Sequence, residues 1–314
     1  MNIRSVSRRG FTLAETMISA VLVVVVGGVA LNLLIGGFIQ FARNVALNQS
    51  AQQSRATLNT IVRRLESAID TPQLVTLTND ALVASTGTYA PGVRFHRMIG
   101  GAYKITDPVS VTQGTGSTAL SYTSATTTTL TLTFNGAWPA PSPGDRVLFL
   151  NPSDIRETVS SGSSPGDKPG RKISAVGSVS GTNPKTVTVT LQSAPGKQIL
   201  CGNPCYILRE AALVAVDVDG RRQLRYYDFT GNLNSFVVVA WDLDPLPRER
   251  DASGTIIQPF GITTVNGHAQ VLCDVPVRIN EYQATLSRLR QTDEFNGFLR
   301  TGSSVVLKSN FSTK

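Results

Sequence analysis

The chain has 314 residues, a formal net charge of +8, and 16% charged against 41% hydrophobic residues. This length allows one large domain or two small ones, and the composition excludes a disordered, charge-rich chain. Three cysteines are too few for a disulfide-dense scaffold, and His96 and His268 alone make a multi-histidine metal site implausible, so we expect no metal and no cofactor. Without the first ten residues the net charge is +5, which is too low for a nucleic-acid-binding charge density.

The first predicted element is a long apolar helix. Residues 16–42 form an uncharged run of 27 residues between Glu15 and Arg43. An α-helix needs about 20 apolar residues to cross the hydrocarbon core of a bilayer. Because arginines precede the run and the long remainder is polar, we expect a single-pass protein with its N-terminus in the cytoplasm and its head outside.

Glu15 is the unusual residue of this segment, because it stands at the start of the apolar run. A lone carboxylate in lipid is costly, and intramembrane acids are usually functional and paired. The residues alone leave three ordinary alternatives open, namely a plain signal anchor, a secretory signal cleaved after Gly28-Val29-Ala30, and a buried core helix.

A motif around this acid resembles the class III signal of type IV prepilins. It reads Arg8-Arg9-Gly10-Phe11-Thr12-Leu13-Ala14-Glu15 and is followed by the uncharged run. Pseudopilins of type II secretion and of competence systems share this motif, and the resemblance covers about residues 4–70. It implies that a prepilin peptidase cleaves between Gly10 and Phe11 and methylates the new amine of Phe11. It also implies that Glu15 pairs with the N-terminal amine of a neighbouring subunit.

The resemblance divides the chain into four parts. We expect a leader at 1–10, a transmembrane helix half at 11–42, an amphipathic helix half at 43–70 and a β-rich head at 71–314. Many major pilins carry a helix-kinking proline in the span, whereas the first proline here is Pro72.

The helix is expected to continue beyond the apolar run and to end near Pro72. One apolar stripe at helical spacing predicts a single helix over residues 12–69, about 87 Å long, whose second half packs on the sheet of its own head. The stripe consists of Leu47, Ala51, Leu58, Ile61, Val62, Leu65 and Ile69.

The remainder is expected to be rich in β-strands. Residues 110–133 contain 14 Ser or Thr in 24 and alternate like a strand near their end, so a small inserted β module is predicted at 110–200. A β-meander follows over 212–241, with hairpin turns at Asp219-Gly220 and Gly231-Asn232, and late strands at 271–279 and 303–308. A helix followed by antiparallel strands predicts an α+β fold.

The cysteines suggest one disulfide. Cys201 and Cys205 flank the short Gly-Asn-Pro turn between two strand-like segments, and an exported head meets oxidising conditions. We expect a Cys201–Cys205 disulfide and a buried, unreactive Cys273.

No catalytic motif occurs, so we expect a protein that is not an enzyme. Asp217-Val218-Asp219-Gly220 favours a hairpin turn over a calcium loop, because the full EF-hand spacing is absent. Arg221, Arg222 and Arg225 share a predicted hairpin, where they could contact an anionic surface or DNA. A solvated strand face is the default interpretation of these arginines.

The resemblance implies a minor pilin or pseudopilin, nearest to W-type minor pilins and J-type pseudopilins. Such a subunit has the prepilin peptidase, other pilin subunits, the inner-membrane assembly platform and membrane lipid as partners. It resides in the inner membrane before it enters an extracytoplasmic or cell-surface filament. Two alternatives remain, a DNA-binding subunit of a competence pilus and a membrane-anchored surface enzyme or binding protein.

The motif generates a first prediction about processing. The mature chain should begin at Phe11 with a methylated amine, because Gly10 offers the peptidase a backbone without a side chain. Mass spectrometry of the N-terminal peptide measures this directly. A mature start at Leu31 would instead support the secretory signal.

Overall fold

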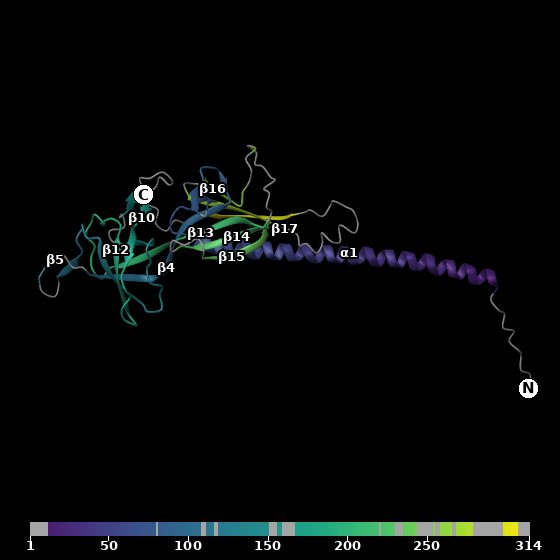
Figure 1. The fold of residues 1–314 in the computed structure, drawn as a ribbon, viewed down its shortest axis with the longest axis horizontal. Coiled ribbons are helices and arrows are strands. Elements are labelled where there is room, and N and C mark those ends of the chain that lie inside the picture. The colour runs from purple at the N-terminus through teal and green to yellow at the C-terminus, as the bar shows by residue number, and fades with distance from the viewer. Residues whose placement is uncertain are drawn as a thin grey trace, which may run out of the picture. The chain divides into compact units, whose positions relative to one another are not determined.

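The computed structural model has an α+β architecture, with one long N-terminal helix followed by a head of antiparallel strands (Figure 1). It forms two compact units, Met1–Gln52 with Ile279–Gly297, and Gln53–Arg278 with Phe298–Lys314. The structure describes residues 12–79, 81–107, 111–115, 119–150, 156–158, 167–219, 221–229, 235–243, 254, 258–265, 268–278 and 298–306.

Helix α1 runs without interruption from Leu13 to Glu66, which confirms the single long helix. It contains no proline. Between Leu13 and Phe41 its large apolar side chains are exposed. The helix is long and apolar enough to cross a membrane.

The second unit has its main core around the end of α1. Leu58, Ile61 and Leu65 are buried there, which confirms that this stretch of the apolar stripe packs on its own head. The strands that pack on the end of α1 complete this core, with Leu74, Ala90, Val93, Phe95, Ala211, Leu213, Ala215, Leu224, Tyr226, Ala240, Leu243, Phe260, Val271 and Cys273. Other side chains of the same strands form a smaller cluster, which contains Val75, Ala212, Val214 and Tyr227.

The strands are antiparallel wherever they pair. Their bounds are β1 Gln73–Thr78, β2 Ala81–Ala84, β3 Tyr89–Ala90, β4 Gly92–Asp107, β5 Val111–Gln113, β6 Leu120–Tyr122, β7 Thr129–Phe134, β8 Arg146–Phe149, β9 Arg156–Thr158, β10 Asp167–Pro169, β11 Arg171–Val176, β12 Lys185–Leu191, β13 Pro204–Val218, β14 Arg221–Asp228, β15 Phe236–Leu243, β16 Phe260–Val265, β17 His268–Arg278 and β18 Phe298–Val306.

One part of the sheet is closed into a six-stranded barrel. The pairing runs β4–β7–β12–β11–β8–β13, and β13 pairs again with β4. The barrel interior is filled by a second core of aliphatic and aromatic side chains, which include Tyr103, Leu130, Phe149, Ile173 and Val189. The module expected at 110–200 was not predicted to close, and β4 and β13 supply two of its walls from outside that range. Both strands, with 16 and 15 residues, are long enough to serve the barrel and the open sheet.

The open sheet continues from β13 through β14, β15, β17 and β16 to β3, while β18 pairs with β17. The β13–β14 hairpin turns at Asp219, whose φ is 50°, so the predicted turn at Asp219-Gly220 is confirmed in place of a calcium loop. The second predicted turn, Gly231-Asn232, lies outside the described residues. Strand β4 was not predicted, because charged residues and Gly100-Gly101 interrupt its alternation. A Cβ on Gly101 would lie 2.5 Å from the Trp138 ring, so this interruption is needed for close packing.

The core around α1 allows a stability prediction. Ile61→Ala should destabilise the head by about 2–5 kcal/mol, because it leaves a cavity at a side chain that is completely buried. Urea denaturation of the full chain in a mild detergent measures the loss. Leu120→Ala, at a half-exposed side chain of β6, is the matched control and should cost less than about 0.5 kcal/mol. Equal losses for the two variants would contradict the packing of α1 on the sheet.

Candidate functional site

The predicted processing site is only partly within the described residues. Gly10 and Phe11 lie outside them, and Glu15 occupies the first turn of α1. The Glu15 carboxylate accepts hydrogen bonds from the backbone N–H of Thr12 at 2.9 Å and from the Thr12 hydroxyl at 3.1 Å. The Glu15 N–H in turn donates to the Thr12 hydroxyl at 3.4 Å, which completes a reciprocal helix cap. Glu15 is exposed, so its carboxylate is accessible to a cation beyond its own helix.

The expected Cys201–Cys205 disulfide is wrong in this structure, since both residues carry thiols. The two flanks do not form the hairpin that would bring the sulfurs together. Leu200 bridges to Tyr122, whereas Cys205 pairs with Tyr103 and Phe149 in the barrel. The Cys205 side chain is thereby directed into the barrel core, away from the turn that holds Cys201.

Cys273 is buried on β17, as predicted. Burial raises the pKa of the Cys205 thiol to about 12, and burial together with Asp274 raises that of Cys273 to about 12. Both thiols are therefore protonated and poorly nucleophilic at neutral pH.

A polar cluster of the head lies where β4 and β13 pass from the open sheet into the barrel. On one face, the His96 ring nitrogen Nδ1 lies 2.5 Å from Asp70 Oδ2, and the His96 backbone N–H donates to Asp70 Oδ1 at 2.8 Å. Asp70 follows the end of α1, so this contact ties the helix end to β4. Arg94 lies 3.3 Å from Glu210, and His96 Nε2 lies 4.0 Å from the same carboxylate.

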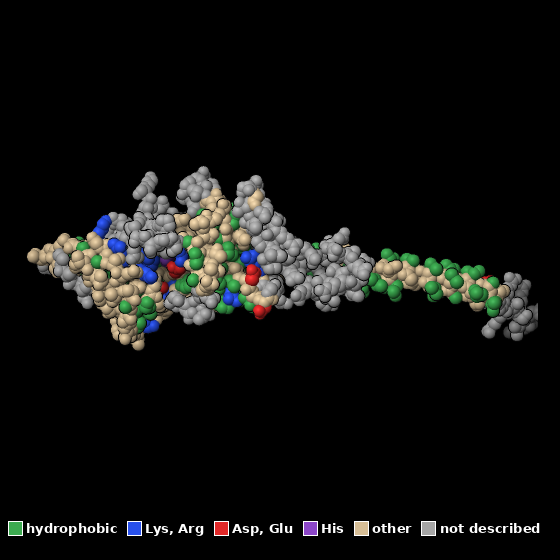
Figure 2. All heavy atoms as spheres, turned by 45° about the horizontal axis from the view of Figure 1, so that its top comes forward, with side chains coloured by type: hydrophobic (Ala, Val, Ile, Leu, Met, Phe, Trp, Pro, Cys, Tyr) green, Lys and Arg blue, Asp and Glu red, His purple; other side chains and the backbone are tan. Residues whose placement is uncertain are grey.

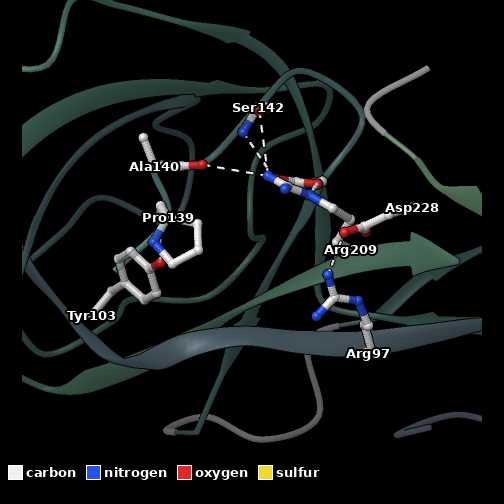
Figure 3. Close-up of polar contacts among 8 residues, drawn as sticks. Arg97, Tyr103, Pro139, Ala140, Ser142, Arg209 and Asp228 are labelled. Atoms are coloured by element: carbon white, nitrogen blue, oxygen red, sulfur yellow. Dashed lines mark hydrogen bonds and ion pairs between the residues drawn. The ribbon is translucent and has the colours of Figure 1, made fainter. Parts of the chain in front are cut away.

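The other face carries two ion pairs side by side. Arg97 and Arg209 stand directly opposite each other across the β4–β13 pairing. Arg97 pairs with Asp228 of β14, and Arg209 donates to both carboxylate oxygens of Asp145 at 2.9 and 2.8 Å. Figure 3 shows the Arg209 side chain pointing towards Ala140 and Ser142 of the loop before β8, and the Arg97 side chain pointing towards Asp228.

The two ion pairs offset charges that would otherwise destabilise this part of the sheet. Like charges directly opposite in a sheet repel, and the carboxylates of Asp145 and Asp228 offset that repulsion. Asp145 is completely buried, so losing Arg209 would leave an uncompensated charge in the interior. Burial raises the pKa of Asp145, and the hydrogen bonds from Arg209 only partly oppose that rise. We call the residues Asp70, Arg94, His96, Arg97, Asp145, Arg209, Glu210 and Asp228 the charged seam.

The ion pairs of the charged seam tie the end of α1 to β4, and β4 and β13 to their neighbours. Within the described part of the head, no hydrogen bond joins His96 to a serine or cysteine side chain. Among the described residues, no group of three or more His, Cys, Asp or Glu side chains is placed to hold a metal ion. Sequence reasoning missed this seam, because its members are spread over residues 70–228 and only the β4–β13 register unites them.

The arginines considered for anion binding do not gather into one exposed cluster. Arg222 is buried and lies 3.5 Å from Asp217, whereas Arg225 stacks on the Phe236 ring at 4.0 Å and donates to Gln223. The side chain of Arg221 lies outside the described part of the structure.

Comparison with known proteins adds no relative. No protein-family model, no curated protein and no solved structure matches the chain.

The thiol geometry predicts an ordered pattern of labelling. In the native protein only the half-buried Cys201 should react with a thiol reagent, and three thiols should react after unfolding without reductant. Cys201→Ser should abolish native labelling, while Cys273→Ser should leave it unchanged. A peptide that joins residues 201 and 205 under non-reducing conditions would overturn this assignment.

The Asp70–His96 contact predicts acid sensitivity. Burial alone would raise the pKa of Asp70, but the charge and hydrogen bonds of His96 outweigh it and hold the pKa below its usual value. Because this folded pKa lies below the unfolded value of about 3.9, the carboxylate stabilises the head at higher pH, and its contribution is lost as the pH falls through the folded pKa.

Asp70→Asn should therefore lower the melting temperature at neutral pH, and its difference from the natural protein should narrow below about pH 4. Thermal unfolding of both proteins across this range tests the effect. Asp219→Asn, at an exposed turn, is the control and should show no such difference. A gap between Asp70→Asn and the natural protein that is constant with pH would contradict the role of the charge.

Proposed function

We propose that this chain is a minor pilin or pseudopilin, a non-enzymatic structural subunit of a type IV pilus-like or type II secretion filament. The observation that carries the proposal is the motif Gly10-Phe11-Thr12-Leu13-Ala14-Glu15 directly before the 27-residue uncharged run. Each part of this motif has a proposed role. The glycine gives the peptidase an open cleavage site, and the acid five residues after it needs a specific cation inside the lipid.

The chemistry of assembly follows from that arrangement. Removal of residues 1–10 would take away three arginines and leave a single positive amine on Phe11. Inside a membrane, the carboxylate of Glu15 is stable only beside a cation, and a neighbour's amine supplies one. Only one axial offset between subunits satisfies both charges, so the pair would set the register of the filament.

The helix cap bears on the state before assembly. Thr12 satisfies the Glu15 carboxylate through two hydrogen bonds within one chain. Such bonds lower the cost of holding the acid near lipid while the subunit waits in the inner membrane. In the filament, the stronger charge-assisted bond to an amine would compete with them.

The head supports a minor rather than a bulk subunit. It contains an open sheet that packs on α1 and a complete six-stranded barrel, which is a large volume to repeat along a filament. The partners of the proposed subunit are the prepilin peptidase, other pilin subunits, the assembly platform and membrane lipid, with the head outside the cytoplasmic membrane. The competence alternative gains no support from Arg222 and Arg225, since the first is buried and the second is stacked on Phe236.

Glu15→Gln tests this proposal. The variant should be cleaved after Gly10 normally and should enter filaments poorly, because the proposed partner of the acid is a neighbouring amine and not the peptidase. Sheared filaments and membranes are compared by immunoblot with a head antibody. Glu66→Gln, at the other end of α1, removes the same charge and is the matched control. Normal incorporation of Glu15→Gln would remove the pairing argument, and failure of cleavage would assign Glu15 to the peptidase instead.

A further inference from the structure

The outer wall of the barrel has a composition unlike the rest of the head. Two stretches of sequence, residues 108–144 and 168–209, contain no aspartate or glutamate. The barrel places strands from both stretches side by side, since β7 from the first pairs with β12 and continues to β11 from the second. The barrel thus brings together on one wall two acid-free stretches that are separate in the sequence.

Hydroxyl groups form a regular array on this wall. Alternation directs Leu130, Leu132 and Phe134 into the barrel and leaves the threonines of β7 and β12 outside. Three threonine pairs then face each other across the two strands: Thr129 with Thr190, Thr131 with Thr188 and Thr133 with Thr186. Neighbouring strands lie about 4.8 Å apart and alternate residues about 6.7 Å apart, so hydroxyls repeat on a grid of that size.

Two lysines flank this array. Lys104 of β4 pairs with Thr133 on one side, and Lys172 lies on β11 at the other, and both side chains are exposed. In Figure 2, the end of the head that carries β12 in Figure 1 shows mainly uncharged polar and backbone atoms, with Lys or Arg among them. We call this wall the threonine face, consisting of Lys104, Thr106, Thr129, Thr131, Thr133, Lys172, Ser174, Thr186, Thr188 and Thr190.

Much of the hydrogen-bonding capacity of the face is available to a ligand. Thr106 bonds the carbonyl of Thr131 and the hydroxyl of Thr133, and Thr186 bonds Ser180. Within the described part of the chain, the hydroxyls of Thr129, Thr131, Thr188 and Thr190 make no hydrogen bond. Each can both donate and accept.

We propose that the threonine face binds an acidic polysaccharide. Repeating hydroxyls match a polymer whose own hydroxyls and carboxylates donate and accept, and the lysines supply charge complementarity at both sides. Nucleic acid fits less well, because single strands need aromatic platforms and dense phosphate contacts, and this face has no aromatic side chain and only two cations. The proposal concerns the barrel and is independent of the filament role of α1.

The test uses the full chain in detergent micelles on immobilised polymers. Polygalacturonate and heparin are the acidic probes, dextran is the neutral probe and single-stranded DNA is the competing polyanion. The natural protein should be retained on both acidic polysaccharides, should elute with salt and should pass through dextran. Absence of retention on both acidic polymers, or stronger retention on DNA, would overturn the proposal.

Matched variants separate the face from nonspecific charge. Lys104→Gln with Lys172→Gln should weaken retention about tenfold, as expected for the loss of charge-assisted hydrogen bonds. Arg55→Gln with Arg63→Gln, which removes the same charge from exposed sites on α1, should leave retention unchanged. Thr131→Val with Thr188→Val keeps the β-branched shape and removes the central hydroxyls, so it should weaken binding, while Thr76→Val with Thr78→Val on β1 should not. Equal effects in the two members of either set would overturn the assignment, and unchanged melting temperatures show that each variant is folded.

Discussion

The pairing of β4 with β13 is the constraint on which the rest of the head depends. It extends from Gly92 opposite Val214 to Lys104 opposite Pro204, far beyond the five or six residues of an ordinary strand. The first part of this ladder belongs to the open sheet that packs on the end of α1, and the last part closes the barrel. A slip of one residue would turn every core side chain of both modules outward.

The charged seam lies where this ladder changes from one module to the other. Phe95 and Ala211 face the core around α1, whereas Ile99 and Ile207 face the barrel core. Between them the two cores are separated by Arg97, Arg209 and their carboxylate partners. This boundary tolerates little change at Asp145, because its carboxylate is completely buried and Arg209 is its ion-pair partner.

The two ends of helix α1 lie in different environments. Its first part exposes large apolar side chains that water would disfavour, and its last turns bury Leu58, Ile61 and Leu65 against strands. The hydrophobic effect therefore acts on the same helix twice, in the first part through lipid or neighbouring subunits under the proposed function, and in the last turns through the head itself. The cap between Thr12 and Glu15 starts this helix without any residue from the head.

The local patterns of the sequence were sufficient for the features that depend on near neighbours. The uncharged run predicted the long helix, the stripe from Leu58 to Leu65 predicted its packing on the head, and turn chemistry predicted the turn at Asp219. The structure contains all three features. The motif that resembles a prepilin signal was also found from the sequence by itself, because it is a short run of residues that includes Gly10 and Phe11. Contacts between distant residues were decided only by the tertiary structure. Barrel closure, the seam from Asp70 to Asp228 and the separation of Cys201 from Cys205 all depend on the register of β4 and β13. That register is set by the total burial of two long strands, and no short window of sequence contains this information.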